Sequence, residues 1–234
     1  MAPLVRPPVP VTVSNGADAT AQPSVLARFD SHCIEQGARS FCARKPEIVT
    51  RLLPAFGILA QGTQIRVPTG SVAIEDLGLG DTIAPGDGGT AQITWIGEVT
   101  LRPDALDTPW LRRVQPERFG FGRPLSDSIL GAAAEVQLGG ARDISKPLST
   151  FGHDDMITAL VPQAPVRMFQ IACASPAWAV ANGLSIRTLN TDGFLSRQPD
   201  LLAQMFARFM PGLTTRPAPE RFVTASPFRR ARLG

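Results

Sequence analysis

Residues 62–101 read GTQIRVPTGSVAIEDLGLGDTIAPGDGGTAQITWIGEVTL, and this stretch decides the predicted fold. Polar and apolar residues alternate in 64–67, and they alternate again at Ile93, Trp95 and Val99. A period of two residues is typical of strands that bury one face. The Gly-Asp-Gly-Gly segment at 86–89 marks a turn between two such strands. The stretch therefore predicts short β-strands joined by turns.

The composition of the whole chain agrees with a mainly β fold. The 234 residues include 22 Pro and 21 Gly, a content that favours many short strands and turns over long helices. The hydrophobic content of 44% is sufficient for a buried core. The dipeptide Asn182-Gly183 between two apolar runs predicts a hairpin turn. Strands are expected near 63–68, 72–75, 81–84, 91–101, 109–115, 127–138, 157–161, 165–173 and 176–182.

The chain divides into five predicted segments by composition and periodicity. The first is rich in Pro, Ala, Ser and Thr, and the second has weak helical periodicity, with Pro46 at a helix start and Pro54 at its end. We expect a flexible leader at 1–24, a small helical or irregular lead-in at 25–55, the β-domain at 56–190, a C-terminal amphipathic helix at 191–212 and a basic mobile tail at 213–234.

The predicted C-terminal helix is the clearest helical signal in the chain. Within RQPDLLAQMFARFM at 197–210, Pro199 stands at the helix start, and Pro211-Gly212 follows its end. A helix docked on the sheet is the favoured interpretation, and a contact for a partner or a membrane is the alternative. The residues expected on its apolar face are Leu201, Leu202, Met205, Phe206 and Phe209.

Charge argues against a nucleic-acid-binding protein. The formal net charge is only +3, and the basic residues Arg229, Arg230 and Arg232 form the one local cluster, at the end of the chain. A nucleic-acid-binding domain would carry a basic stripe, and aromatic residues would alternate with it on a stacking platform. We interpret the cluster as a solvated tail.

Cysteine content and targeting signals favour a cytoplasmic protein, with non-classical export as an alternative. Cys33, Cys42 and Cys173 are odd in number and widely spaced, so reduced thiols are expected rather than a disulfide framework. No run approaches the roughly 20 apolar residues of a membrane span. The N-terminus also lacks the apolar segment of a secretory signal.

Four blocks of sequence follow one another in a recognisable order. They are Gly-Thr at 62–63 with Glu-Asp-Leu at 75–77 and Gly-Asp at 80–81, Ile-Thr-Trp-Ile-Gly at 93–97, Gly-Arg-Pro at 122–124 before Asp127, and Val-Arg-Met-Phe at 166–169 before Ala-Asn-Gly-Leu at 181–184. Together they resemble the Hint (Hedgehog/intein) domain, in particular its bacterial branch, over residues 56–190. The resemblance implies an all-β horseshoe fold and a family activity of self-cleavage or protein splicing.

The positions that carry this activity in the family hold unreactive residues here. Self-cleavage needs a Cys or Ser nucleophile and a His that protonates the leaving amide. In the register of the resemblance, the nucleophile position is Ile58 and the His position is Ala134. The late His-Glu pair falls at Pro176 and Ala177, and the preceding Asp falls at Ala174. None of these side chains can supply a nucleophile or a proton, so no catalytic residue is expected.

Two residues remain as fallback candidates if the register is shifted. Cys42 would be the nucleophile and His153 the acid of an active autoprocessing domain. Thr63 is the hydroxyl nearest to the missing Cys, but it follows five residues later, and His32 lies before the domain. Cys173 stands among apolar residues and is interpreted as buried.

No metal site or acid–base pair is expected. His153 with Asp154 and Asp155 has no second His at ligand spacing. Glu75 and Asp76 would point to opposite faces of a strand. The remaining acidic residues considered, Asp104, Asp107 and Asp192, are interpreted as turn residues.

The leading functional hypothesis is therefore a Hint domain that is a non-catalytic binding or structural module, with no cofactor and with an unidentified protein partner. The alternative is active self-cleavage through Cys42. A third hypothesis is that the chain is another β-rich module, associated with phage or secretion machinery.

Overall fold

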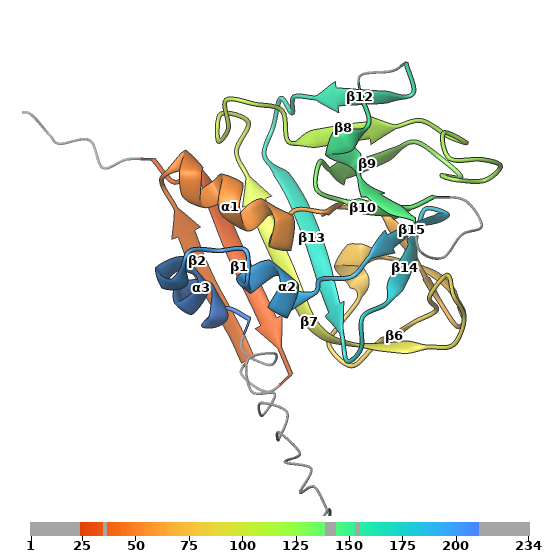
Figure 1. Ribbon diagram of the computed structural model, residues 1–234, viewed down its shortest axis with the longest axis horizontal. Helices are drawn as coiled ribbons and strands as arrows, with labels where there is room; N and C mark the ends of the chain where they lie inside the picture. Colours follow the sequence, from red (N-terminus) through yellow and green to blue (C-terminus); the bar gives the residue numbers. More distant parts are fainter. Residues whose placement is uncertain (1–23, 35–36, 139–143, 153–154, 211–234) are drawn as a thin grey trace, which may run out of the picture.

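The protein, as a computed structural model, is mainly β and is described over residues 24–34, 37–138, 144–152 and 155–210 (Figure 1). The strands in these ranges are β1 (Ala27–Cys33), β2 (Gly37–Ala43), β3 (Leu59–Ala60), β4 (Gln64–Val67), β5 (Gly70–Ala73), β6 (Thr82–Ile83), β7 (Ala91–Leu101), β8 (Leu111–Val114), β9 (Ser128–Gly131), β10 (Glu135–Gln137), β11 (Ser145–Pro147), β12 (Ile157–Leu160), β13 (Val166–Cys173), β14 (Trp178–Ala181) and β15 (Leu184–Arg187). The α-helices are α1 (Pro46–Phe56), α2 (Thr191–Leu195) and α3 (Asp200–Ala207), and the 3-10 turns are η1 (Ile74–Asp76) and η2 (Leu148–Thr150).

These strands form two antiparallel sheets. The larger sheet has the order β12-β8-β9-β3-β13-β7-β1-β2, and β6 also pairs with β7. The smaller sheet has the order β11-β10-β15-β14-β4-β5. The long strand β7 organises the larger sheet, because β13 pairs along one of its edges and β1 pairs along the other.

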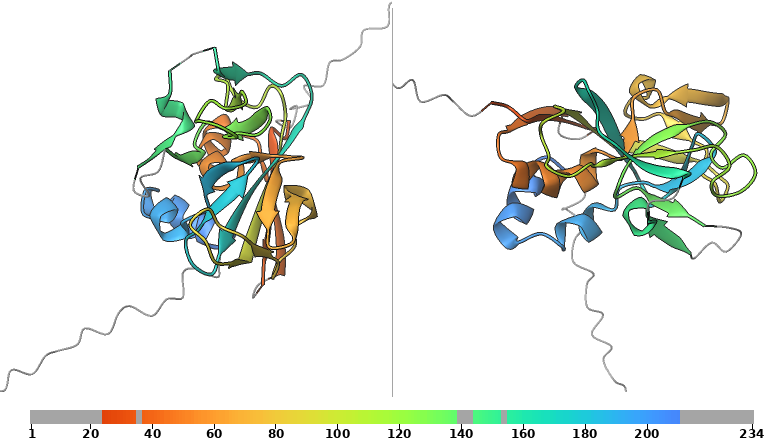
Figure 2. Two further views of the ribbon diagram at one scale, coloured as in Figure 1. Left: turned by 90° about the vertical axis from the view of Figure 1, so that its right-hand side faces the viewer. Right: turned by 90° about the horizontal axis from the view of Figure 1, so that it is seen from above.

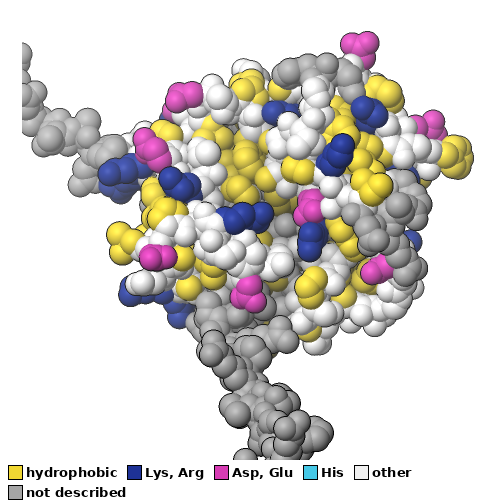
Figure 3. Space-filling view, in the orientation of Figure 1, with side chains coloured by type: hydrophobic (Ala, Val, Ile, Leu, Met, Phe, Trp, Pro, Cys, Tyr) yellow, Lys and Arg dark blue, Asp and Glu magenta, His cyan; other side chains and the backbone are white. Residues whose placement is uncertain are grey.

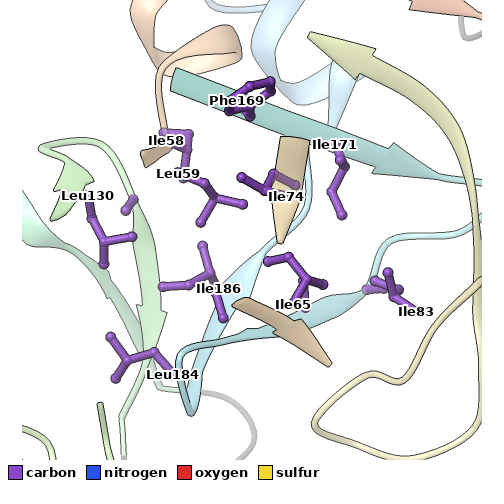
Figure 4. Close-up of a cluster of buried hydrophobic side chains, with 14 of the residues drawn as sticks. Ile58, Leu59, Ile65, Ile74, Ile83, Leu130, Phe169, Ile171, Leu184 and Ile186 are labelled. Carbon is purple, nitrogen blue, oxygen red and sulfur yellow. The ribbon is translucent and has the colours of Figure 1, made fainter. Parts of the chain in front are cut away.

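A first core, which we call the sheet core, fills the space between the two sheets (Figure 4). Leu59, Ile65 and Ile186 come from different strands and converge there with Ile74 of η1. Burying each such side chain contributes about 1.5–3 kcal/mol relative to leaving it in water. The labelled members in Figure 4 are Ile58, Leu59, Ile65, Ile74, Ile83, Leu130, Phe169, Ile171, Leu184 and Ile186.

A second core, the flank core, joins the segments that lie before and after the predicted β-domain. Helices α1, α2 and α3 lie together on one face of the larger sheet, over its β1–β2–β7 end (Figures 1 and 2). There Phe56 packs edge-on against both Phe29 and Trp95, with ring centroids 5.2 Å apart in each pair. Its principal members are Phe29, Val49, Leu53, Phe56, Trp95, Val99, Met168, Phe194, Phe206 and Met210.

The prediction of a helical or irregular lead-in at 25–55 is correct only for α1. Strands β1 and β2 pair antiparallel with each other, and β1 also pairs with β7 over all seven of its residues. In β1 the buried residues Ala27, Phe29, Ser31 and Cys33 alternate with more exposed ones, as expected of a strand with one buried face. Helix α1 begins at Pro46 as predicted but continues past Pro54 to Phe56.

The C-terminal helical region also differs from its prediction. It consists of two helices, α2 and α3, and the second is shorter than the predicted amphipathic helix. Phe206 is fully buried as expected, whereas Leu201 is 79% exposed. The packed face runs through Leu202, Met205, Phe206 and Met210, and Leu201 points away from it.

Two further elements correct the predicted strands. The segment predicted as extended at 127–138 is two strands, β9 and β10, separated by a turn at 132–134. Glu75 and Asp76 lie in the turn η1 and not on a strand. The hairpin prediction is confirmed, since Asn182 and Gly183 have φ angles of 47° and 86° and join β14 to β15. Positive φ at both central residues is typical of a two-residue hairpin turn.

Other predictions concern parts of the chain that the structure does not describe. The leader lies almost entirely in residues 1–23, and the basic tail lies in 211–234, so both fall outside the described residues. Within the described residues, none of the helices has the length and apolar character needed to span a membrane.

Candidate functional site

The peptide bond between Gly57 and Ile58 is where α1 passes into β3. The indole N–H of Trp110 donates to the Gly57 carbonyl at 2.8 Å, and the Ile58 N–H donates to the Phe169 carbonyl at 3.1 Å. Both polar groups of this peptide are thus hydrogen-bonded. The Ile58 side chain is 2% exposed and belongs to the sheet core. The predicted nucleophile position therefore holds a packed aliphatic side chain.

The predicted His position lies in the turn between β9 and β10. Ala134 is fully buried, its N–H donates to the Gly131 carbonyl at 2.9 Å, and its carbonyl accepts from Leu148. Gly131 itself approaches the Gly57 peptide closely, because a Cβ built on it would lie 2.0 Å from the Gly57 carbonyl oxygen. The backbone of Gly131 and the indole of Trp110 therefore lie against the same carbonyl.

The late predicted positions lie at the β13–β14 connection. Ala174 and Pro176 are exposed, and Ala177 is buried. The Ala177 backbone exchanges hydrogen bonds of 3.1 Å with the hydroxyl of Thr188. Ala177 thus links the start of β14 to the residue after β15, and none of the three positions carries a group that titrates.

A pocket of about 640 Å³ opens beside Ile58. Its walls come from the end of α1, β10, β13, β15 and the segment that contains α2, and it lies on the face shown in Figure 3. Such a volume falls in the range of ligand pockets. Among the described residues that line it, none is Cys or His. The lining residues are Pro54, Ile58, Ala133, Glu135, Pro147, Ser149, Gln170, Arg187, Thr188, Leu189, Asn190, Gly193, Phe194, Arg197 and Gln198.

The charged residues that line the pocket are one carboxylate, Glu135, and two guanidinium groups, Arg187 and Arg197. Glu135 and Arg187 form an ion pair of 3.2 Å, in which Arg187 also lies over the Trp178 ring. Gln170 is 4% exposed, accepts from the Ile171 N–H and donates weakly to the Arg187 carbonyl at 3.4 Å. The Arg197 guanidinium makes no hydrogen bond or ion pair with a described residue. The pocket therefore has an excess of positive charge.

The fallback nucleophile Cys42 lies far from the peptide bond that the family would cut. It is exposed on β2, at the edge of the larger sheet. Strands β1, β7 and β13 lie between β2 and β3, so the separation is about 19 Å at a strand spacing of about 4.8 Å. Cys42 is therefore not placed to attack the Gly57–Ile58 peptide, and its role as the nucleophile of a shifted register stays a prediction. The other fallback residue, His153, lies outside the described residues.

The other polar residues considered in the sequence either form hydrogen bonds within the fold or lie on its regular elements. Thr63 is buried, and its hydroxyl donates to the Ala60 carbonyl at 2.6 Å. The Glu75 carboxylate accepts from the Gly62 N–H at 2.8 Å, which fixes the same turn. His32 is exposed on β1, and Asp192 lies in the first turn of α2 rather than in a loop.

The three cysteines differ in burial, and burial affects the reactivity of their thiols. All three are free, with Cys33 and Cys173 buried and Cys42 exposed. Burial raises the pKa of the Cys173 thiol to about 11, because desolvation disfavours the thiolate. Cys173 is therefore protonated and unreactive at neutral pH, as the sequence predicted for a buried thiol.

A metal centre is absent from the part of the chain that the structure describes, where no three His, Cys, Asp or Glu residues gather. Of the predicted His-Asp-Asp loop, His153 and Asp154 lie outside that part.

The sequence analysis missed the residues that define the pocket. Glu135, Gln170 and Arg197 are separated by dozens of residues in the sequence and line one pocket only through the fold. One signal was available for Gln170, since it is the polar residue in the apolar run 168–173 of β13. A polar residue in such a strand is buried only where it has partners or lines a cavity.

The fold defines a mainly β-domain with two antiparallel sheets, and comparison with known proteins gives its family. A family model described as "Hint domain" matches residues 58–192, which is more than half of the chain. The protein belongs to the Hint domain family. This confirms the family expected from the sequence and excludes the third hypothesis of an unrelated β-rich module.

Solved structures with a similar fold are inteins. The gp41-1 intein is 15% identical, with a TM-score of 0.37, and the match covers 57% of this chain and 98% of the intein. The MchDnaB-1 intein is 16% identical, with a TM-score of 0.36, and the match covers 56% of this chain and 99% of the intein. The search of curated proteins finds no match.

Proposed function

We propose that this Hint domain does not process its own backbone and that it acts as a binding module through the pocket beside Ile58. The observation that carries the proposal is the environment of the Gly57–Ile58 peptide. A packed isoleucine stands at the position predicted for the nucleophile, and the carbonyl of the preceding Gly57 accepts a hydrogen bond from Trp110. An indole N–H can stabilise an oxyanion, so the missing elements are the nucleophile and the acid.

The flanking segments support the same proposal. β1 pairs with β7, and the flank core joins residues before Gly57 to residues of the sheets. The hydroxyl of the buried Ser31 donates to the Phe209 carbonyl and accepts from the Trp95 indole at 2.8 Å, so both flanks meet there. Cleavage at Gly57–Ile58 would leave the two parts packed together. Such an arrangement suits a permanent module rather than a domain that releases its neighbours.

An experiment can distinguish the proposal from the alternative, which is self-cleavage by a displaced nucleophile. The full-length protein and its Cys42→Ala variant are incubated for a day with and without dithiothreitol, and fragments are followed on denaturing gels. The proposal expects full-length chains in every lane. Thiol-dependent fragments from the parent protein would contradict it, and their loss in Cys42→Ala would assign the reaction to Cys42.

A further inference from the structure

The pocket beside Ile58 is lined by a guanidinium group, that of Arg197, which has no ion-pair partner among the described residues. Arg197 follows α2 in the sequence. The carboxylate in the lining, Glu135, is already bonded to Arg187 and accepts from the hydroxyl of Ser145. A guanidinium presents a planar set of donors that matches a carboxylate. The free charge of the pocket therefore fits an anionic group of the ligand.

Gln198, which follows Arg197 in the sequence, supplies a hydrogen-bond acceptor. The side-chain oxygen of Gln198 is buried without a hydrogen-bond donor, although Gln198 lines the pocket. A buried oxygen without a donor is costly, and the terminal torsion of a glutamine is soft, so its amide can turn toward a donor in the pocket. A ligand with an N–H group next to its carboxylate would satisfy both Arg197 and Gln198.

The inner wall supplies a donor and apolar surface. The Gln170 amide nitrogen has two protons and makes one weak bond of 3.4 Å, which leaves a proton for a ligand carbonyl. Ile58, Ala133 and Phe194 add apolar lining beside it. This combination fits a short stretch of peptide backbone with an apolar side chain.

We infer that the pocket binds a carboxylate that carries a neighbouring amide N–H, as in the C-terminal residue of a peptide or a free N-acylated amino acid. The carboxylate lies on Arg197, the amide N–H meets the Gln198 side-chain oxygen, and the acyl carbonyl accepts from Gln170. This inference rests on the proposed function, because it names the ligand class of the same pocket.

The test uses the full-length protein and nuclear magnetic resonance of its side-chain N–H groups. Three probes are titrated, namely the tripeptide N-acetyl-Ala-Ala-Val as the free acid, the same peptide with a C-terminal amide, and N-acetylvaline. Titration to about 10 mM detects binding with a Kd near 1 mM. We expect the two acids to shift the signals of Arg197 and Gln170 saturably, and the peptide amide to leave them unchanged. Tighter binding of the tripeptide acid than of N-acetylvaline would identify a peptide as the source.

A matched pair of variants assigns the contact. Arg197→Gln removes the guanidinium from the pocket, and Arg208→Gln removes an exposed guanidinium that does not line it. Arg197→Gln is expected to weaken binding of the acids about tenfold or more, and Arg208→Gln to leave it unchanged. The inference would be overturned if neither acid gave a saturable shift or if the peptide amide bound as tightly as the acids. An equal loss of affinity in Arg197→Gln and Arg208→Gln would also overturn it. None of these results changes the mass of the chain, so a failure here is distinct from a failure of the proposed function.

Discussion

At the scale of single residues, the site is built from close contacts rather than from reactive groups. The Gly57 carbonyl, the Trp110 indole and the Gly131 backbone lie against one another, so side chains other than glycine do not fit at 131. Ile58 and Ala134 complete this region as buried apolar residues. The positions predicted from the sequence for a nucleophile and an acid therefore hold buried side chains that pack in the fold.

The first prediction concerns Gly131. In Gly131→Ala the added Cβ would lie 2.0 Å from the Gly57 oxygen and 2.7 Å from the Trp110 indole nitrogen. The free energy of unfolding should fall by about 1–3 kcal/mol, as for other overpacked sites. Gly152→Ala is the control, because its Cβ meets nothing within 4 Å. Urea unfolding compares the two, and equal stability of the variants would show that the close approach is not formed.

The second prediction concerns the thiols. In the folded protein at pH 8, one thiol should react rapidly with Ellman's reagent, and this fast phase should disappear in Cys42→Ala. Cys173 should react slowly until the pH approaches its pKa of about 11, because burial keeps the thiol protonated below that pH. Rapid reaction of all three thiols at pH 8 would contradict the burial of Cys33 and Cys173.

At the scale of elements, the flanking segments complete the larger sheet. β1 pairs with one edge of β7, and α3 packs over this end of the sheet through Phe206. An isolated domain beginning at β3 would leave that edge of β7 unpaired and the flank core incomplete. Exposed strand edges and apolar surface favour aggregation.

The docking of α3 gives the third prediction. Phe206→Ala should lower the free energy of unfolding by about 3–5 kcal/mol, because Phe206 is fully buried in the flank core. Leu201→Ala lies on the same helix but is 79% exposed, and it should change stability by no more than about 0.5 kcal/mol. Thermal or chemical unfolding measures both. A larger loss of stability in Leu201→Ala than in Phe206→Ala would contradict this prediction. It would mean that Leu201 lies on the packed face of the helix, as expected from the sequence.

Sequence periodicity predicted some elements well and failed at others for a physical reason. The alternation in 91–101 gave β7 with the bounds that the structure shows. The same alternation exists in β1, but its buried face includes Ser31, which takes its partners from Trp95 and Phe209. A polar residue with distant partners hides the pattern, because only the fold supplies those partners. Arg197 was missed as a pocket residue because the residues that line the pocket with it include ones far away in the sequence, such as Ile58 and Glu135.

At the scale of the whole molecule, two cores meet along β7. The sheet core lies between the two sheets, and the flank core holds the N-terminal hairpin, α1 and the C-terminal helices against the larger sheet. Strand β7 contributes to both cores, with Ile93 and Ile96 in the sheet core and Trp95 and Val99 in the flank core. The N-terminal hairpin, α1 and the C-terminal helices thus belong to the same folded unit as the two sheets.

The fourth prediction tests this unity. When residues 1–57 and 58–234 are produced together as separate chains, they should copurify, because the pairing of β1 with β7 and the flank core hold them. Ser31→Asp in the first piece should abolish copurification, since it would place a charge in a buried position. Independent, soluble pieces that do not associate would contradict the two-core arrangement.

The most direct test of the central claim is the intact mass of freshly purified full-length protein, before and after incubation with dithiothreitol. A Hint domain without a nucleophile at residue 58 should give one species of 25.0 kDa under both conditions. Two fragments whose masses locate the break between Gly57 and Ile58 would contradict the claim and show that a reactive group survives.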